Sequence, residues 1–161
     1  MASSGQLDSG LAEIEAGLET WRSIGGLNNR THFLNLLADV YRLADRPNDG
    51  LSALDEAEEI ATRFELHAHA VETHRMRGEL CSALGREDEA EASWLKAIGV
   101  ARQQSTRTLE LRAVNNLATL WCNQNRSREA SELLSPALDC FTEGFDTMDL
   151  KEAKALLDEI T

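Results

Sequence analysis

The chain matches its own pattern when it is shifted by 40 residues, and this internal repeat limits the fold more than any other feature of the sequence. The repeated units begin at residues 31, 71 and 111. In the first unit the recurring positions are Leu34, Leu37, Ala38 and Tyr41, followed by Gly50, Leu54 and Ala57. Small residues with large apolar residues three or four positions away are typical of two antiparallel helices that cross closely. Because one helix pair cannot bury its apolar face alone, the repeat predicts an all-α protein in which helix pairs stack into an α-solenoid.

The other two units repeat these positions with two departures. The counterparts are His74, Arg77, Gly78, Cys81, Ala90, Trp94 and Ala97 in the second unit, and Val114, Leu117, Ala118, Trp121, Ala130, Leu134 and Ala137 in the third. His74 replaces a large apolar residue, and Arg77 replaces a leucine. In spacing and residue type the units resemble the tetratricopeptide repeat, although that family's unit has about 34 residues. The resemblance implies a right-handed superhelix of antiparallel helix pairs.

Helical periodicity, together with the placement of glycine and proline, predicts eight helices in a single domain. The predicted helices span residues 9–24, 29–45, 48–64, 69–85, 87–104, 107–125, 127–142 and 148–160. Residues 1–8 are expected to be a disordered start or an expression remnant, and residues 9–161 form the domain. This domain is expected to contain a half repeat at 9–26, repeats at 31–64, 71–104 and 111–144, and a capping helix at 148–160.

The first predicted helix lacks a partner, because it corresponds to the second half of a repeat. Its apolar stripe consists of Leu11, Ile14, Leu18 and Trp21. We expect this stripe to be covered by a neighbouring domain of a longer parent protein, or by a second copy of the chain. The four residues are therefore candidates for self-association, and a homo-oligomer is one expected assembly.

The chain carries a formal net charge of −12, which opposes binding to a phosphate backbone. Nucleic acid is therefore not an expected partner. No apolar run approaches the roughly 20 residues of a membrane span, and residues 1–10 lack the layout of a signal peptide. The spacing of the three cysteines fits neither a disulfide framework nor a zinc knuckle. These features predict a cytoplasmic protein without a membrane partner.

The concave surface of such an array is lined by positions 2, 5, 9 and 12 of the first helix in each unit. The candidate partner-binding residues at these positions are His32, Asn35, Asp39, Arg42, Glu72, Arg75, Glu79, Arg112, Asn115 and Thr119. Their mixture of amide, guanidinium and carboxylate groups can hydrogen-bond a peptide or a helix, with Arg75 and Arg112 as partners for carboxylates. The alternative is a solvated face whose charges pair with one another, and the sequence leaves both interpretations open.

The sequence predicts no catalytic, cofactor-binding or metal-binding residues. His67, His69 and His74 are the sharpest metal alternative. However, residues two apart on a helix do not face one another, and His74 occupies a core position of the repeat. Cys81 and Cys122 have no histidine and acid placed beside them by the repeat pattern. The phosphate-binding motif Gly-x-x-x-x-Gly-Lys-Ser/Thr is absent from the sequence.

The last third of the chain resembles a narrower family. The resemblance rests on residues 109–113, 117–121, 141–147 and 149–157, and it is most specific over 107–158. These segments are similar to the C-terminal repeat region of bacterial signalling proteins in which an adenylate/guanylate cyclase-type domain precedes an ATPase module. The resemblance implies a non-catalytic scaffold that senses or recruits a protein or peptide partner for those linked domains. A structural oligomerisation element without its own ligand is the alternative, and a small-molecule sensor is a third hypothesis.

Overall fold

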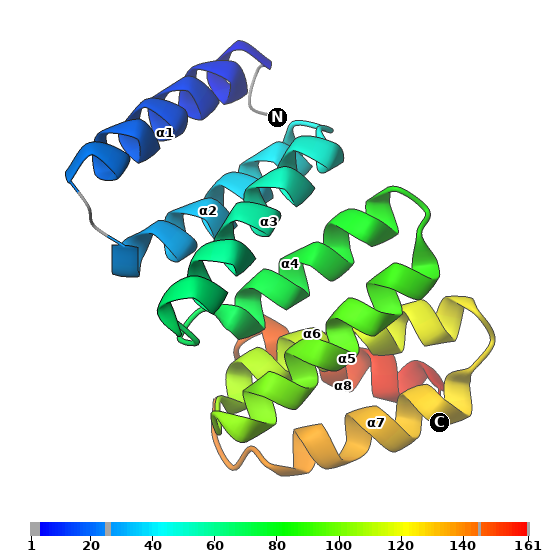
Figure 1. Cartoon of the computed structure of the whole chain (residues 1–161). Helices are drawn as coiled ribbons and strands as arrows, with labels where there is room; N and C mark the ends of the chain where they lie inside the picture. The colour runs from blue at the N-terminus through cyan, green and yellow to red at the C-terminus, as the bar shows by residue number, and fades with distance from the viewer. Residues whose placement is uncertain (1–3, 25–26, 145, 161) are drawn as a thin grey trace.

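The protein folds into a stack of helices that follow one another in chain order (Figure 1). The computed structural model describes residues 4–24, 27–144 and 146–160, and these residues contain helices without any strand. The eight helices of this part are α1 (Ser4–Ile24), α2 (Leu27–Leu43), α3 (Pro47–Phe64), α4 (Ala70–Ala83), α5 (Glu87–Gln103), α6 (Arg107–Asn123), α7 (Ser127–Asp139) and α8 (Met148–Ile160). The predicted all-α solenoid-like fold is therefore confirmed.

Most predicted helix boundaries lie within two residues of the observed ones, and two differ by more. Helix α1 begins at Ser4, so the prediction of a disordered segment was wrong for residues 4–8. Leu7 lies four residues before Leu11, and this spacing continues the helical pattern toward the N-terminus. Residues 1–3 lie outside the described part. Helix α7 ends at Asp139 rather than at residue 142, and the chain leaves the helix where Phe141 packs against the core.

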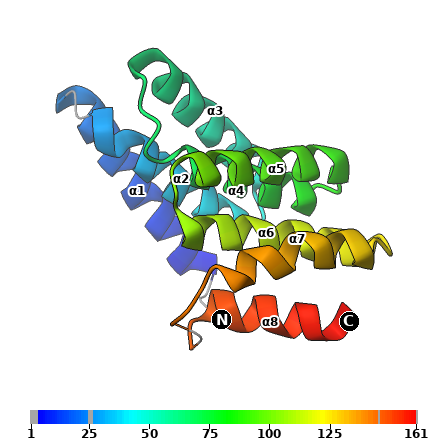
Figure 2. The same ribbon diagram turned by 90° about the horizontal axis from the view of Figure 1, so that it is seen from below.

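The helices form an inner and an outer set. The inner helices α2, α4, α6 and α8 each contact the next member of the set. Each outer helix, α1, α3, α5 or α7, contacts inner helices, and in the described part of the chain no outer helix contacts another. The three repeats correspond to the hairpins α2–α3, α4–α5 and α6–α7. Helix α8 packs on α6 and α7 at the C-terminal end of the stack (Figure 2).

The turn inside each repeat has the same geometry, 40 residues apart. The second residue after the inner helix of each repeat has a positive φ: 57° at Asp45, 70° at Gly85 and 61° at Asn125. The following arginine N–H donates to a carbonyl five residues back: Arg46 to Tyr41 at 2.8 Å, Arg86 to Cys81 at 2.9 Å and Arg126 to Trp121 at 2.7 Å. Such a bond with a left-handed residue satisfies the last carbonyl groups of a helix. The repeated turns bring each outer helix back along its inner helix.

Small residues allow the close helix crossings that the repeat predicted. Gly78 of α4 faces the Trp94 ring of α5, and a Cβ atom at position 78 would overlap that ring. The indole Nε1 of Trp94 donates to the Arg75 carbonyl oxygen at 3.1 Å, which holds the ring over Gly78. A Cβ at Gly50 of α3 would lie 2.9 Å from a Leu80 methyl group. These contacts fix how closely α4 approaches both of its outer neighbours.

The buried apolar side chains form two clusters. The N-terminal core joins α1, α2 and α3 with two side chains of α4, and its buried members are Leu11, Leu34, Leu37, Ala38, Tyr41, Ala53, Leu54, Ala57, Ile60, Met76 and Leu80. The C-terminal core extends from Val71 and Cys81 of α4 through α5, α6 and α7 to Leu150 and Ala153 of α8. Leu51 is partly buried and packs against both. Across the described helices, none combines the length and apolar character needed to cross a bilayer.

Candidate partner-binding trough

The inner helices carry two adjoining hollows, which we together call the trough. The larger, of about 580 Å³, is lined by Arg42, Glu79, Ser82, Ala83, Trp94, Asn116, Thr119, Leu120 and Asn123. The smaller, of about 240 Å³, is lined by Arg75, Glu79, Arg112, Asn115, Asn116, Asp149 and Glu152. Because both hollows include Glu79 and Asn116, the trough runs from α2 across α4 and α6 to α8. Six of the ten predicted concave-face residues line it, namely Arg42, Arg75, Glu79, Arg112, Asn115 and Thr119.

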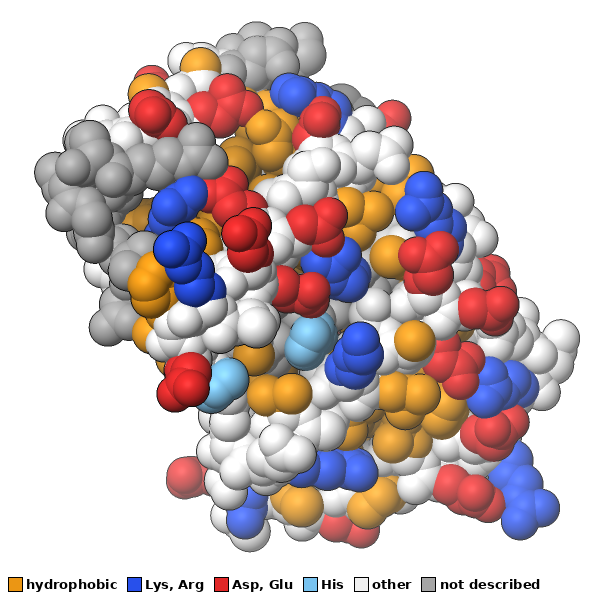
Figure 3. Space-filling model, viewed as in Figure 1, with side chains coloured by type: hydrophobic (Ala, Val, Ile, Leu, Met, Phe, Trp, Pro, Cys, Tyr) orange, Lys and Arg blue, Asp and Glu red, His pale blue; other side chains and the backbone are white. Residues whose placement is uncertain are grey.

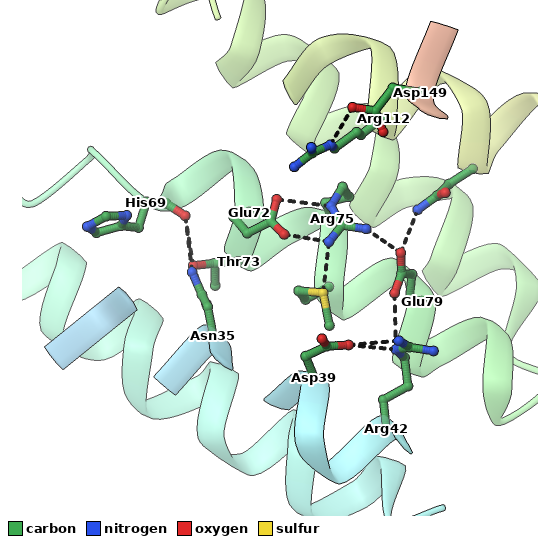
Figure 4. A network of polar contacts seen from close by, with 12 residues as sticks. Asn35, Asp39, Arg42, His69, Glu72, Thr73, Arg75, Glu79, Arg112 and Asp149 are labelled. Carbon is green, nitrogen blue, oxygen red and sulfur yellow. Dashed lines mark hydrogen bonds and ion pairs between the residues drawn. The ribbon is translucent and has the colours of Figure 1, made fainter. Parts of the chain in front are cut away.

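Charged side chains in the trough form ion pairs with one another (Figure 4). Arg42 of α2 lies between two carboxylates: its Nη2 is 2.8 Å from Asp39 Oδ1 and its Nε is 3.3 Å from Glu79 Oε2. Asn116 Nδ2 also donates to Glu79, with 3.0 Å to Oε1. Glu79 therefore connects the inner helices of all three repeats. On the face seen in Figure 3, acidic and basic side chains are likewise interspersed over the surface.

Arg75 lies at the centre of this network, and its side chain is only 13% exposed. Its Nε donates to Glu72 Oε2 at 3.0 Å, and its Nη groups bond Glu72 and Glu79. Burial opposes the charge on Arg75, but the bonds to the two carboxylates raise its pKa above the ordinary arginine value. For Arg75, internal pairing is the interpretation that the structure supports. Because its guanidinium already pairs with Glu72 and Glu79 of this chain, Arg75 is less available to a partner's carboxylate than the sequence predicted.

Asn35 and Asn115, two of the predicted partner-binding residues, are both buried. Asn35 is 3% exposed and Asn115 is 8% exposed. Asn35 Nδ2 donates to the His69 carbonyl at 3.5 Å, and Asn115 Nδ2 donates to the Asp149 carbonyl at 2.9 Å. Each amide thus joins its inner helix to the start of the next one. A buried amide needs such a hydrogen-bond partner. Because Asn35 and Asn115 occupy the same position in the repeat, the sequence could have indicated that they play the same structural role.

Three of the predicted residues remain accessible. Arg112 is 44% exposed, and its Nε donates to Asp149 Oδ2 at 2.9 Å. Within the described residues its Nη groups make no hydrogen bond, so Arg112 keeps donors for a partner. Thr119 is exposed and donates to the Asn115 carbonyl at 2.8 Å. His32 is exposed, with its ring 5.2 Å from that of His69 between centroids.

The candidate list from the sequence missed several uncharged residues of the trough. Asn116, Leu120 and Asn123 of α6 line the larger hollow beside Thr119. Positions 112, 116, 119 and 123 are separated by three or four residues and so share one face of α6. Extending the predicted positions along that spacing would have found Asn116 and Asn123.

The predicted self-association stripe is partly covered by the chain itself. Leu11 is 3% exposed in the N-terminal core, and Ile14 packs partly buried against the same cluster. Because α2 already covers Leu11, this side chain does not offer a surface to a second copy, contrary to the prediction. The side chains of Leu18 and Trp21 lie outside the described residues.

The histidines and cysteines do not gather into a reactive cluster. His74 Nδ1 lies 3.2 Å from Glu58 Oε1, whereas His67 is exposed. Among the residues described, no three His, Cys, Asp or Glu side chains are placed to hold a metal ion. Burial raises the pKa of the Cys81 thiol, which disfavours the nucleophilic thiolate. Among the described residues, the trough is therefore the candidate functional site.

Comparison with known proteins gives no family assignment. Protein-family models give no match to the chain, and no curated protein matches it. The fold and the trough are consequently the observations from which a function can be argued.

Proposed function

We propose that the chain is a non-catalytic protein–protein interaction scaffold that binds a polypeptide segment along the trough. The observation that carries this proposal is the continuity of the trough over inner helices from all three repeats and α8. A hollow that crosses successive repeats suits an elongated partner, because each repeat presents further contacts at a fixed spacing.

The chemistry of the trough favours contacts to peptide groups. Its charged side chains largely neutralise one another, whereas Ser82, Asn116, Thr119 and Asn123 present hydroxyl and amide groups. Such groups both donate and accept hydrogen bonds, as peptide groups do. Arg112 adds exposed donors near the α8 end, where a carboxylate of the partner would bind.

The role of the chain within a longer protein is proposed from the sequence resemblance alone. There the chain would be the C-terminal sensor or recruitment module of a bacterial, cytoplasmic cyclase- or ATPase-type signalling protein. Binding in the trough would be passed to the linked catalytic domains, and catalysis would belong to those domains. The alternative is an oligomerisation element without its own ligand.

Selection of displayed random peptides on residues 1–161 tests the proposal. Selected peptides are then measured against Asn116→Ala/Thr119→Ala, which removes polar groups from the trough. The matched control is Thr62→Ala/Gln103→Ala, two exposed polar residues on outer helices α3 and α5. We expect affinity to fall about tenfold or more for the trough variant, as loss of paired polar groups predicts, and to stay unchanged for the control.

Equal loss in both variants, or no peptide that depends on the trough, would contradict the proposal. Light scattering of the same protein addresses the alternative. A stable dimer at micromolar concentration, with no trough-dependent peptide, would favour the oligomerisation element.

A further inference from the structure

Helix α4 lies between the two cores and belongs to both. Met76 and Leu80 are buried in the N-terminal core, whereas Val71 and Cys81 are buried in the C-terminal core. With 3.6 residues per turn, Met76 and Leu80 point toward one side of α4, and Val71, Gly78 and Cys81 point toward the other. The helix therefore presents one apolar face to each half of the molecule.

The two remaining faces of α4 are polar. Arg77 lies on the outer one with His74 at its edge, and Arg75 and Glu79 lie nearly opposite Arg77 on the trough side. In the other repeats the positions of His74 and Arg77 hold Leu34 and Leu37, or Val114 and Leu117. These four apolar side chains are all buried. The substitution by His74 and Arg77 explains why the apolar core is divided at this helix.

The outer face of α4 is tied to α3 by ionic contacts. Arg77 Nη2 lies 2.8 Å from Asp55 Oδ1, and Arg77 Nε lies 3.2 Å from Glu58 Oε1. His74 Nδ1 lies 3.2 Å from the same Glu58 oxygen, and its hydrogen bond lowers the pKa of Glu58 below the ordinary value. We call the two Arg77 contacts the outer ion pairs. Because they are partly exposed, solvent and salt weaken them.

A second ionic contact crosses the same boundary on the opposite side. Arg42 of α2 reaches Glu79 of α4, with 3.3 Å between Nε and Oε2. We call it the trough-side ion pair (Figure 4). The apolar contact of Met76 and Leu80 with the N-terminal core lies between this pair and the outer ion pairs. At its centre Leu80 fits against Gly50, where no side chain blocks the approach.

The α3–α4 boundary also differs from the next one along the chain. Helix α3 has a smaller contact with α4 than α5 has with α6. Residues 65–69 form the link at this boundary, whereas only residues 104–106 separate α5 from α6. Figure 2 shows α1, α2 and α3 inclined to the common direction of α4–α8. The direction of the stack therefore changes where its apolar core is divided.

We propose that the α3–α4 boundary is a joint at which α1–α3 rock against α4–α8, held by ionic contacts on opposite sides of an apolar pivot. Rocking in one direction stretches the outer ion pairs and closes the trough, and rocking in the other stretches the trough-side ion pair and opens it. The larger hollow spans the joint, because Arg42 lies on α2 and Asn116, Thr119 and Asn123 lie on α6. The width of the hollow is therefore set by the balance of the two groups of ion pairs.

Pulsed electron paramagnetic resonance on the full chain tests this proposal. Spin labels at Leu43→Cys and Asn123→Cys measure the distance across the larger hollow, since both positions are exposed. Cys122→Ser and Cys140→Ser remove the more accessible thiols, while Cys81 is buried. The control pair, Ser82→Cys with Asn123→Cys, lies entirely on the α4–α8 side of the joint.

Removing the ion pairs on one side of the joint should change the Leu43–Asn123 distance in the opposite direction to removing those on the other side. Arg77→Gln removes two outer ion pairs, so the Leu43–Asn123 distance should shorten by about 2 Å or more. Arg42→Gln removes the trough-side ion pair, so the same distance should lengthen by a similar amount. The control distance should stay unchanged in both variants. Raising NaCl from about 0.05 M to about 0.5 M should broaden only the distance across the joint.

Shifts in the same direction, or no shift in either variant with an unchanged width in salt, would overturn the proposal. Equal shifts in the control pair would also overturn it, because the movement would then not lie at this boundary. If Arg77→Gln does not fold, Glu58→Gln weakens one outer ion pair and the His74 contact and must shorten the distance in its place.

Discussion

The first and third repeats are joined to the next inner helix by the same bond, yet only the first junction is completely paired. Asn35 and Asn115 are 80 residues apart, and so are the carbonyl groups that they bond, those of His69 and Asp149. Thr73 Oγ1 lies 2.9 Å from Asn35 Oδ1 and supplies a donor to it. The residue 80 positions after Thr73 is Ala153, and in the described structure Asn115 Oδ1 has no hydrogen-bond partner.

The repeat thus preserves the hydrogen bond that links successive inner helices more strictly than the side-chain pairing around that bond. An amide that bonds a backbone carbonyl ties the start of the next inner helix to the preceding one, whatever side chain follows. The second bond depends on a single hydroxyl, and its loss leaves a buried acceptor that costs about 1–3 kcal/mol. Docking of α8 is therefore the less favourable of the two equivalent junctions.

The largest expected effect comes from removing the amides themselves. Asn35→Ala should lower the free energy of unfolding by about 2 kcal/mol, because it removes two buried hydrogen bonds, after which the Thr73 hydroxyl can still donate to the His69 carbonyl at 3.1 Å. Asn115→Ala should cost only about 1 kcal/mol, because Asp149 is half-buried and water can replace part of the bond. Urea denaturation of both variants measures the difference, and equal costs would contradict the comparison.

Exchanging the two unequal residues should reduce the difference between the junctions. Thr73→Ala should cost about 1 kcal/mol, since it leaves Asn35 Oδ1 in the state of Asn115 Oδ1. Ala153→Ser should stabilise α8 by about 1 kcal/mol, because the new hydroxyl can donate to Asn115 Oδ1. Hydrogen exchange of α8 amides reads the second effect directly. Faster exchange in Ala153→Ser would show that the added oxygen does not fit this buried position.

The smallest effect at neutral pH concerns the aromatic residues of the two repeats. Arg46 lies over the Tyr41 ring at 4.7 Å, and Arg126 lies over the Trp121 ring at 4.6 Å. Burial and the hydrogen bond to Glu15, 2.5 Å long, raise the pKa of Tyr41 from 10.0 to about 12. Since the folded-state pKa is raised, this contribution to stability is present below pH 10.0 and is lost as the pH rises through about 12.

Ultraviolet titration can follow this change without interference, because Tyr41 is the single tyrosine of the chain. Glu15→Gln should cost about 0.5 kcal/mol at neutral pH and should move the pKa of Tyr41 back toward 10.0. The third repeat, with Trp121 in the equivalent position, has no such titration. A Tyr41 pKa near 10.0 in the unaltered protein would show that α1 does not cover this ring.

The repeat allowed most of the fold to be predicted, because small and large apolar residues at fixed spacing determine which helix faces meet. Gly78 and Trp94 illustrate this, since their consensus positions already indicated a close crossing. The site was less predictable. Asn35 and Arg75 occupy equivalent positions, yet one is buried against the next helix and the other pairs with Glu72 and Glu79. The contacts of Asn35 depend on the next inner helix, so residue spacing within one helix does not predict them. Glu72 and Glu79 lie three and four residues from Arg75 on the same helix, so spacing could have indicated those pairs, but not that they leave Arg75 largely buried.

The contact between Gly78 and Trp94 also limits how this protein can change over evolutionary time. Any residue with a Cβ at position 78 would overlap the Trp94 ring, so a mutation there is tolerated only after position 94 has become smaller. A smaller residue at 94 alone would leave a cavity in the C-terminal core and cost about 3–5 kcal/mol. Neither single step is favourable, so the two residues are expected to be inherited together.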